Sequence, residues 1–153
     1  MKTRTVLATL VGFFAGLALY AADPQMGTWK LNESKSKLPP SGAKNTMVVY
    51  APAGDKVKVT VDGVDGMGKA FHSEWTGKFD GQDYAVTNDP LGDKRAYTKV
   101  DANTLSFVGK MGNKTIFSGA IVVSADGKSR TVTSSATDEK GTAYSTTSVY
   151  DKQ

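Results

Sequence analysis

Apolar and polar residues alternate along most of the chain, and no stretch shows a sustained helical period. In KVKVTVD (56–62) the three valines share one face, while lysines and a threonine share the other. A period of two predicts a β-strand with one buried face. Similar alternating segments rich in Val, Thr and Tyr recur at 27–32, 46–51, 69–77, 83–88, 94–100, 104–110, 114–124, 129–137 and 142–151.

Turn signals separate these segments at short intervals. Asp-Gly pairs occur at 62–63, 65–66, 80–81 and 126–127, and such pairs supply the positive φ angles that tight hairpins require. Many short strands joined by tight turns form an antiparallel meander, and closure of the meander removes its exposed edges. We therefore predict an all-β fold, a single antiparallel up-and-down β-barrel of about 8–10 strands.

One longer segment, ESKSKLPPSGAKN (33–45), lacks the alternation. Its Pro39-Pro40 pair is incompatible with the centre of a strand because proline cannot donate to the ladder. We predict a loop here, lying across one mouth of the barrel.

The first 22 residues differ from the rest of the chain. Lys2 and Arg4 precede the apolar run VLATLVGFFAGLALYAA, and no acidic residue occurs before Asp23. This pattern is typical of a secretory signal peptide. We therefore expect a signal peptide over residues 1–22, cleavage after Ala21 or Ala22, and a barrel domain over residues 23–153. A protein of this kind is periplasmic or secreted and has no stable membrane insertion after cleavage.

Composition narrows the function classes. The first 22 residues contain two of the 19 basic residues and none of the 15 acidic ones, which leaves a net charge of +2 on the remainder. Scattered lysines without a basic block do not indicate a nucleic-acid partner. With no cysteine and one histidine, neither disulfides nor a conventional zinc site is expected. We predict no metal and no cofactor, and the sequence leaves the oligomeric state open.

A short motif resembles a known superfamily. Gly27-Thr28-Trp29 opens the first predicted strand, and a Gly-x-Trp on the first strand of a small exported barrel resembles the lipocalins and the wider calycin superfamily. The resemblance implies that Trp29 packs at one closed end of the barrel against a cation from a late strand, for which Arg130 is the better match. Ten strands are also similar to the fatty-acid-binding-protein barrel, although the helix pair that caps that barrel is missing or reduced here.

The segment FHSEW (71–75) contains the only histidine. His72 and Glu74 share one face of the predicted strand, and Phe71 and Trp75 share the other. Burying two aromatic rings is favourable, whereas burying a carboxylate and an imidazole is costly unless each finds a partner. We expect the aromatic side chains to face inward. In the alternative interpretation, His72 and Glu74 line a polar cavity as the acid and base of a small hydrolase, such as a glycosidase, or of an isomerase.

The segment RAY (95–97) places Arg95 and Tyr97 on one face. An inward Arg-x-Tyr pair resembles the carboxylate clamp of fatty-acid-binding barrels, whereas an outward pair would be solvated and idle. The last two predicted strands are rich in Ser and Thr on both faces. Such hydroxyl groups are expected either to line a water-filled cavity or to face solvent, because a buried hydroxyl needs a hydrogen-bond partner.

Together these features predict an exported protein that binds a small, hydrophobic or amphipathic molecule inside a barrel. The alternatives are the small barrel enzyme and an envelope protein with a simply packed barrel. The predicted cavity residues are Phe71, Trp75, Tyr84, Arg95, Tyr97, Phe107 and Tyr144, with Arg95 as the polar anchor. Gly27, Trp29 and Arg130 are expected to close one end structurally.

Overall fold

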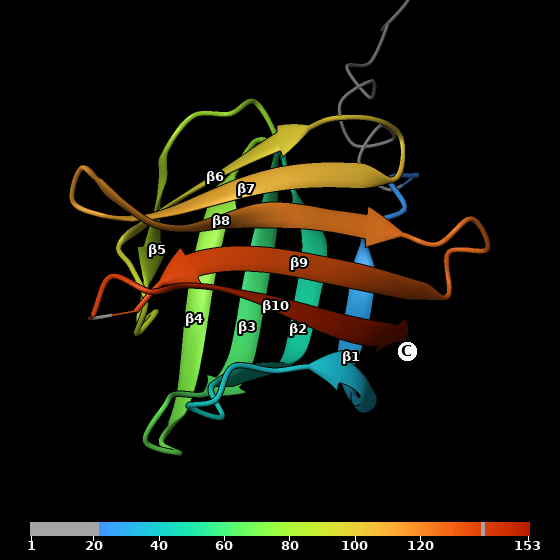
Figure 1. Cartoon of the computed structure of the whole chain (residues 1–153). Helices are drawn as coiled ribbons and strands as arrows, with labels where there is room; N and C mark the ends of the chain where they lie inside the picture. The colour runs from blue at the N-terminus through green and yellow to red at the C-terminus, as the bar shows by residue number, and fades with distance from the viewer. Residues whose placement is uncertain (1–21, 139) are drawn as a thin grey trace, which may run out of the picture.

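Ten antiparallel strands form one closed barrel (Figure 1). The computed structural model describes residues 22–138 and 140–153. The predicted signal peptide, except for Ala22, lies outside these residues. The strands are β1 (Gly27–Lys37), β2 (Lys44–Ala53), β3 (Lys56–Val64), β4 (Ala70–Gly77), β5 (Tyr84–Thr87), β6 (Lys94–Lys99), β7 (Thr104–Met111), β8 (Lys114–Val123), β9 (Ser129–Thr137) and β10 (Ala143–Lys152).

Each strand pairs with its neighbour in the chain, and β1 closes the barrel. Trp29 of β1 lies opposite Val48 of β2 on one side and opposite Lys152 of β10 on the other. The prediction of a single up-and-down antiparallel barrel is therefore confirmed. The described residues contain no helix long and apolar enough to cross a lipid bilayer.

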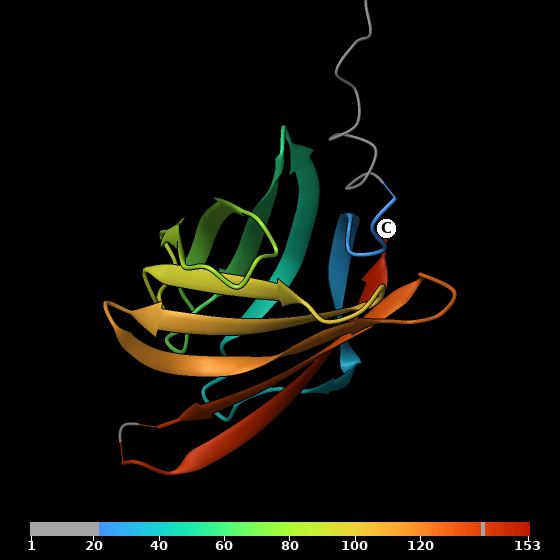
Figure 2. The ribbon, with the colours of Figure 1, turned by 90° about the horizontal axis from the view of Figure 1, so that it is seen from above.

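The barrel is flattened, so that two curved walls face each other. Strands β7–β10 cross in front of β1–β4 at a steep angle in Figure 1, and Figure 2 shows the two walls from above. The inward faces follow the predicted alternation: Val57, Val59 and Val61 of β3 are buried, and Val59 lies opposite buried Trp75 of β4. These inward side chains from both walls form the core.

The end of the barrel near the start of β1, here called the capped end, is sealed by the segment that precedes β1. Trp29 is fully buried, and its indole N–H donates to the Gln25 carbonyl at 2.9 Å. The Gln25 side chain in turn donates to the carbonyl of Asn103, between β6 and β7, at 3.1 Å. These bonds fix residues before β1 against a loop from the opposite wall.

Arg130 of β9 is buried among aromatic rings at the capped end. Its guanidinium carbon lies 4.9 Å from the centre of the Trp29 ring, 4.8 Å from Tyr50 and 5.0 Å from Tyr150. Cation–π attraction is stronger in such a desolvated site than at a surface. Trp29 and Arg130 thus make the contact that the lipocalin resemblance implies.

Gly27 begins β1 at a position that excludes a side chain. Its φ of +117° is rarely adopted by other residues, and a β-carbon would lie 2.8 Å from Cε of Lys152. Glycine here adopts the positive φ and leaves room for the Lys152 side chain, whose Nζ lies 5.0 Å from the centre of the Trp29 ring.

Two local predictions were wrong. The loop predicted over 33–45 is shorter, because β1 continues to Lys37 and β2 begins at Lys44. Lys37 pairs with Thr147 beyond an irregularity in the β1–β10 ladder, so tertiary pairing extends the strand into polar sequence. Asp62-Gly63, predicted as a turn, lies inside β3, and the turn uses Asp65-Gly66 instead.

We expect Trp29→Ala to lower the free energy of unfolding by about 3–5 kcal/mol, because it empties a fully buried aromatic site and removes the stacking surface of Arg130. Urea denaturation of the two proteins measures the loss. Tyr144→Ala, at an aromatic residue that is 40% exposed, is the matched control and should change stability by less than about 0.5 kcal/mol. Equal stability of Trp29→Ala and the wild type would contradict a structural role for this residue.

Candidate functional site

Aromatic rings fill the middle of the barrel. Trp75 and Tyr97 meet edge to face with their ring centres 4.8 Å apart, and Phe79 stacks on Trp75 at 6.4 Å. The ring centres of Tyr97 and Phe107 are 6.3 Å apart. Trp75, Tyr97 and Phe107 are buried and contribute to the core by packing against one another. That these rings also touch a ligand stays a prediction.

Strand glycines make room for several inward rings. A β-carbon on Gly63 would lie 2.7 Å from the Phe71 ring, which comes from the facing position on β4. A β-carbon on Gly119 would lie 2.7 Å from the ring of Phe107, its partner on β7. Each ring therefore lies across the neighbouring strand where that strand has no side chain. The pairing of a glycine with a ring depends on strand register, and sequence reasoning missed it.

Arg95 points into the barrel at the start of β6, toward the end opposite the capped end, here called the far end. Its side chain is 12% exposed, and Nη2 donates to Oδ2 of Asp89 at 2.5 Å. The guanidinium carbon lies 4.7 Å from the centre of the Phe117 ring. Burial would lower the pKa of the Arg95 guanidinium, but interactions with Tyr97 and Asp89 hold the pKa above its usual value.

One donor of Arg95 is unused within the protein. The Nε–H group is buried and has no hydrogen-bond partner among the described residues. A buried donor without a partner costs free energy. Arg130 has two such donors, Nε and Nη1, but aromatic rings surround it at the capped end. Arg95 instead contacts Asp89, a residue that lines a surface groove, so an acceptor from outside the chain would be favourable there. Arg95 and Tyr97 share the inward face, as the clamp interpretation requires.

A surface groove lies beside Asp89, the partner of Arg95. It has a volume of about 570 Å³ and runs between the β3–β4 turn and the β5–β6 loop. Strand β4 pairs with β5 only through Glu74 and Trp75. The first residues of β4 therefore have no strand partner on the β5 side, and the groove lies beside them. Its lining residues are Asp65, Lys69, Ala70, Phe71, His72, Asn88, Asp89 and Pro90. The groove thus brings together predicted Phe71 and Asp89, the partner of Arg95.

Half-buried hydroxyls follow the inner face of β9 and β10 at the far end. Ser134 lies opposite Thr146, and Ser148 lies opposite Val132 on the same face. This strip of hydroxyls contrasts with the capped end, where aromatic rings surround the buried Arg130. It supplies hydrogen-bonding groups at the end of the barrel that Arg95 faces.

His72 and Glu74 lie on the outer face of β4. His72 Nδ1 is 2.6 Å from Oδ1 of Asp62, the residue directly opposite on β3, and Nε2 is 3.6 Å from Oε1 of Glu74. Glu74 also pairs with Lys58 at 3.0 Å. The hydrogen bond to Asp62 raises the pKa of His72, and the hydrogen bond from Lys58 lowers the pKa of Glu74.

The outer cluster of Lys58, Asp62, His72 and Glu74 is exposed to solvent, and its basic and acidic side chains pair with one another. The His72 side chain is 54% exposed, which agrees with the outward facing predicted from the area argument. His72 borders the rim of the groove, whereas Glu74 does not line it. Sequence reasoning missed Asp62 because its Asp-Gly pair was assigned to a turn.

The remaining predicted ligand residues lie in different surroundings. The Tyr84 ring packs edge to face on Trp75 at 5.7 Å, and its hydroxyl donates to Asp80 at 2.8 Å. Tyr144 lies near the β9–β10 turn and is exposed, on the face of β10 that Thr146 and Tyr150 share. That it touches a ligand stays a prediction.

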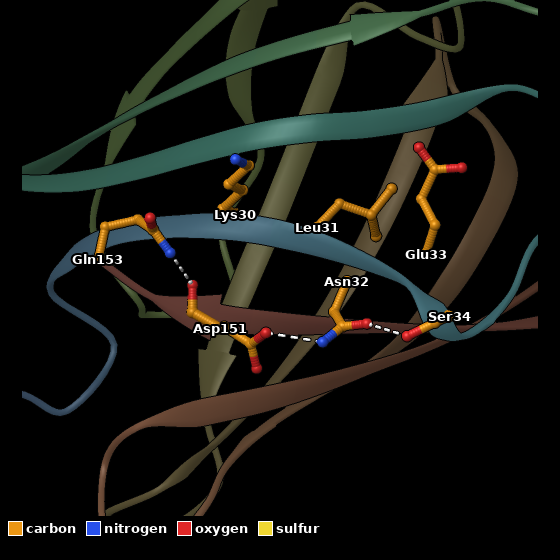
Figure 3. Close-up of a pocket in the computed structure, with 7 residues that line it drawn as sticks. All are labelled: Lys30, Leu31, Asn32, Glu33, Ser34, Asp151 and Gln153. Carbon is orange, nitrogen blue, oxygen red and sulfur yellow. Dashed lines mark hydrogen bonds between the residues drawn. The ribbon is translucent and has the colours of Figure 1, made fainter.

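A second hollow, of about 470 Å³, lies beside β1 and the end of β10 (Figure 3). Its polar groups bond to each other: the Asn32 amide donates to Asp151 at 2.7 Å, and the Ser34 hydroxyl donates to Asn32 at 2.8 Å. The Gln153 amide donates to the Asp151 carbonyl at 3.2 Å. Because these groups satisfy one another, this hollow is a weaker candidate than the groove beside Asp89.

Among the described residues, no group of three or more His, Cys, Asp and Glu side chains is arranged to hold a metal ion.

Comparison with known proteins gives a likeness of fold. No protein-family model and no curated protein matches the chain. A solved structure of EF1p2_mFAP2b bound to DFHBI is similar, with a TM-score of 0.50 and 13% sequence identity. The match covers 87% of this chain and 97% of that one.

We expect NMR titration to give His72 a pKa above about 6.5, the usual value, and Asp62→Asn to lower it. A raised pKa in the folded state means that the stabilisation from this pair is present below the unfolded pKa and is lost as the pH rises through the folded pKa. Stability should therefore decline over that interval in the wild type and less in Asp62→Asn. An identical His72 pKa in both proteins would contradict the assigned contact.

Proposed function

We propose that this protein is an exported carrier whose barrel binds a small amphipathic molecule with an acidic group. The observation that carries the proposal is Arg95, an inward, nearly buried guanidinium with an unused N–H group at the far end of the barrel. Nη2 of Arg95 is paired with Asp89 on a loop, whereas its Nε–H is available to an acceptor that a ligand brings. An acidic group supplies such an acceptor and matches the charge of the guanidinium.

The surroundings of Arg95 indicate the rest of the ligand. A planar guanidinium matches a carboxylate in geometry and charge. Phe117 packs on Arg95, and Phe71 lines the groove beside Asp89, so both offer contact to an apolar body. A mostly apolar site with a few placed polar groups is the usual form of a small-molecule site. These features favour an amphipathic carboxylate over a neutral or strongly polar ligand.

The comparison supports small-molecule binding by analogy only. EF1p2_mFAP2b has a similar fold and is bound to a small molecule, but one fold supports many functions. The contact of Trp29 with Arg130 supports membership of the lipocalin-like calycins. We propose that membership on the basis of this contact and Gly27.

Export rests on the sequence of residues 1–22. The basic start, apolar run and small residues before Asp23 form a signal-peptide pattern. On this basis we place the mature protein in the periplasm or outside the cell.

The enzyme alternative has less support. His72 and Glu74 would need to face a substrate in an enclosed site, but both side chains lie on the outer wall and are paired with Asp62 and Lys58. We therefore assign these residues to the surface of the barrel.

The ligand class can be tested with two compounds that differ in one group. Decanoate and decanol should displace anilinonaphthalene sulfonate (ANS), a fluorescent amphipathic anion, with decanoate the tighter competitor. Arg95→Gln should weaken the binding of decanoate by about tenfold or more, the scale of a lost charged hydrogen bond. The affinity for decanol should change little. Lys110→Gln, which breaks a more exposed ion pair with Asp83, is the control. Equal affinity for decanoate and decanol in the wild type would exclude the carboxylate assignment.

Intact-mass measurement of protein exported by its host should show the loss of about 21 or 22 residues, as cleavage of a signal peptide requires. Recovery of the full-length chain in the membrane fraction would contradict cleavage and indicate an anchor.

A further inference from the structure

The anion position of Arg95 is occupied by a residue of the β5–β6 loop. Oδ2 of Asp89 accepts from Nη2 of Arg95 at 2.5 Å, and its Oδ1 accepts from the Leu91 N–H at 2.8 Å. The Asp89 side chain is only 9% exposed. A carboxylate from the chain therefore stands where an incoming carboxylate would bind.

The loop that carries Asp89 is fixed more firmly at one end than at the other. Asp93 is held from both sides, since its N–H donates to the Lys110 carbonyl at 2.9 Å and its carboxylate accepts from Gly112 at 2.9 Å. At the other end, Asn88 has a φ of 56°, which a non-glycine residue rarely adopts. Asn88 follows β5, a strand of four residues that shares two residue pairs with each neighbour.

Residues 88–92 thus connect a short, weakly paired strand to a fixed point. Short pairing and exposed backbone are typical of segments that open at low free-energy cost. Leu91 within this segment is 53% exposed, so the segment contributes little apolar burial. The bond from Asp89 to Arg95 is therefore an important tie between the loop and the barrel.

The groove described above ends at this tie. Asn88, Asp89 and Pro90 form one side of it, and Ala70, Phe71 and His72 of β4 form the other. A molecule entering the groove would meet the Asp89 carboxylate before it reached Arg95. Displacement of that carboxylate would open the route and free both Nη2 and Nε for the ligand.

We propose that Asp89 is a built-in counter-ion that keeps the unliganded site closed, and that residues 88–92 are a lid released when a ligand carboxylate replaces Asp89 on Arg95. This inference rests on the proposed function, because it concerns regulation of the same site. Asp89 neutralises the buried guanidinium while the site is empty, and competition with it lowers the apparent affinity for every anionic ligand.

The test compares Asp89→Asn with the wild type in the dissociation constants of decanoate and decanol, each obtained by displacement of ANS and corrected for the affinity of that variant for ANS itself. Removing the competing charge should tighten decanoate binding by about tenfold and leave decanol within about twofold. Asp83→Asn, which removes a carboxylate paired with Lys110 just before β5, is the matched control and should change neither. Asp89→Glu keeps the charge and should give no gain.

A measurement on the wild type does not depend on the folding of a variant. Release of the lid should lower the ¹⁵N NMR order parameters of the backbone at residues 88–92 when decanoate is added, because the bond from Asp89 to Arg95 no longer holds the loop. Unchanged or higher order parameters there, or unchanged decanoate affinity in folded Asp89→Asn, would overturn the lid while Arg95-dependent binding still stood. Failure of both the wild type and Asp89→Asn to bind either probe would overturn the proposed function together with the lid.

Discussion

Two guanidinium groups point into the interior of the same barrel, and each is compensated differently. Arg130 is surrounded by the rings of Trp29, Tyr50 and Tyr150, which are fixed by strand pairing. Arg95 is paired with Asp89, a carboxylate on a loop. Because an arginine stays charged at ordinary pH, each end of the barrel must be organised around its cation.

This difference separates a structural end from the end at which we propose the ligand site. At the capped end, hydrogen bonds from Trp29 and Gln25 fix the segment before β1 and leave a dense core. At the far end, half-buried hydroxyls and a surface groove occur near Arg95, whose counter-ion lies on a loop. The aromatic rings centred on Trp75 and Tyr97 lie between the two ends and pack against both walls.

The fold could be predicted because its signals are local. Alternating valines in β3 and the Asp-Gly turns specify antiparallel strands without reference to the rest of the chain. Arg130 was matched to Trp29 only through a resemblance, since a contact between the first and ninth strands has no local signal. Asp62 and Asp89 were missed for the same reason. Asp62 faces His72 through the β3–β4 register, and Asp89 meets Arg95 through the course of a loop, neither of which can be derived from spacing alone.

The extension of β1 into the predicted loop has a related cause. Lys37 has no apolar alternation around it, but pairing with Thr147 of β10 holds it in the sheet. Tertiary pairing thus overrides local preference, as is common for strands. The glycines opposite Phe71 and Phe107 show the same dependence on register, since either glycine alone reads as a turn or a weak point in a strand.

The proposed ligand site lies at the far end, around Arg95, and not in the core or at the capped end. Backbone and side-chain NMR spectra of the labelled protein, recorded as decanoate is added, distinguish these positions. We expect the largest shift changes and ligand contacts at Phe71, Arg95 and Phe117. Changes centred on Trp29 and Arg130, or on the polar hollow around Asn32 and Asp151, would contradict this position of the site.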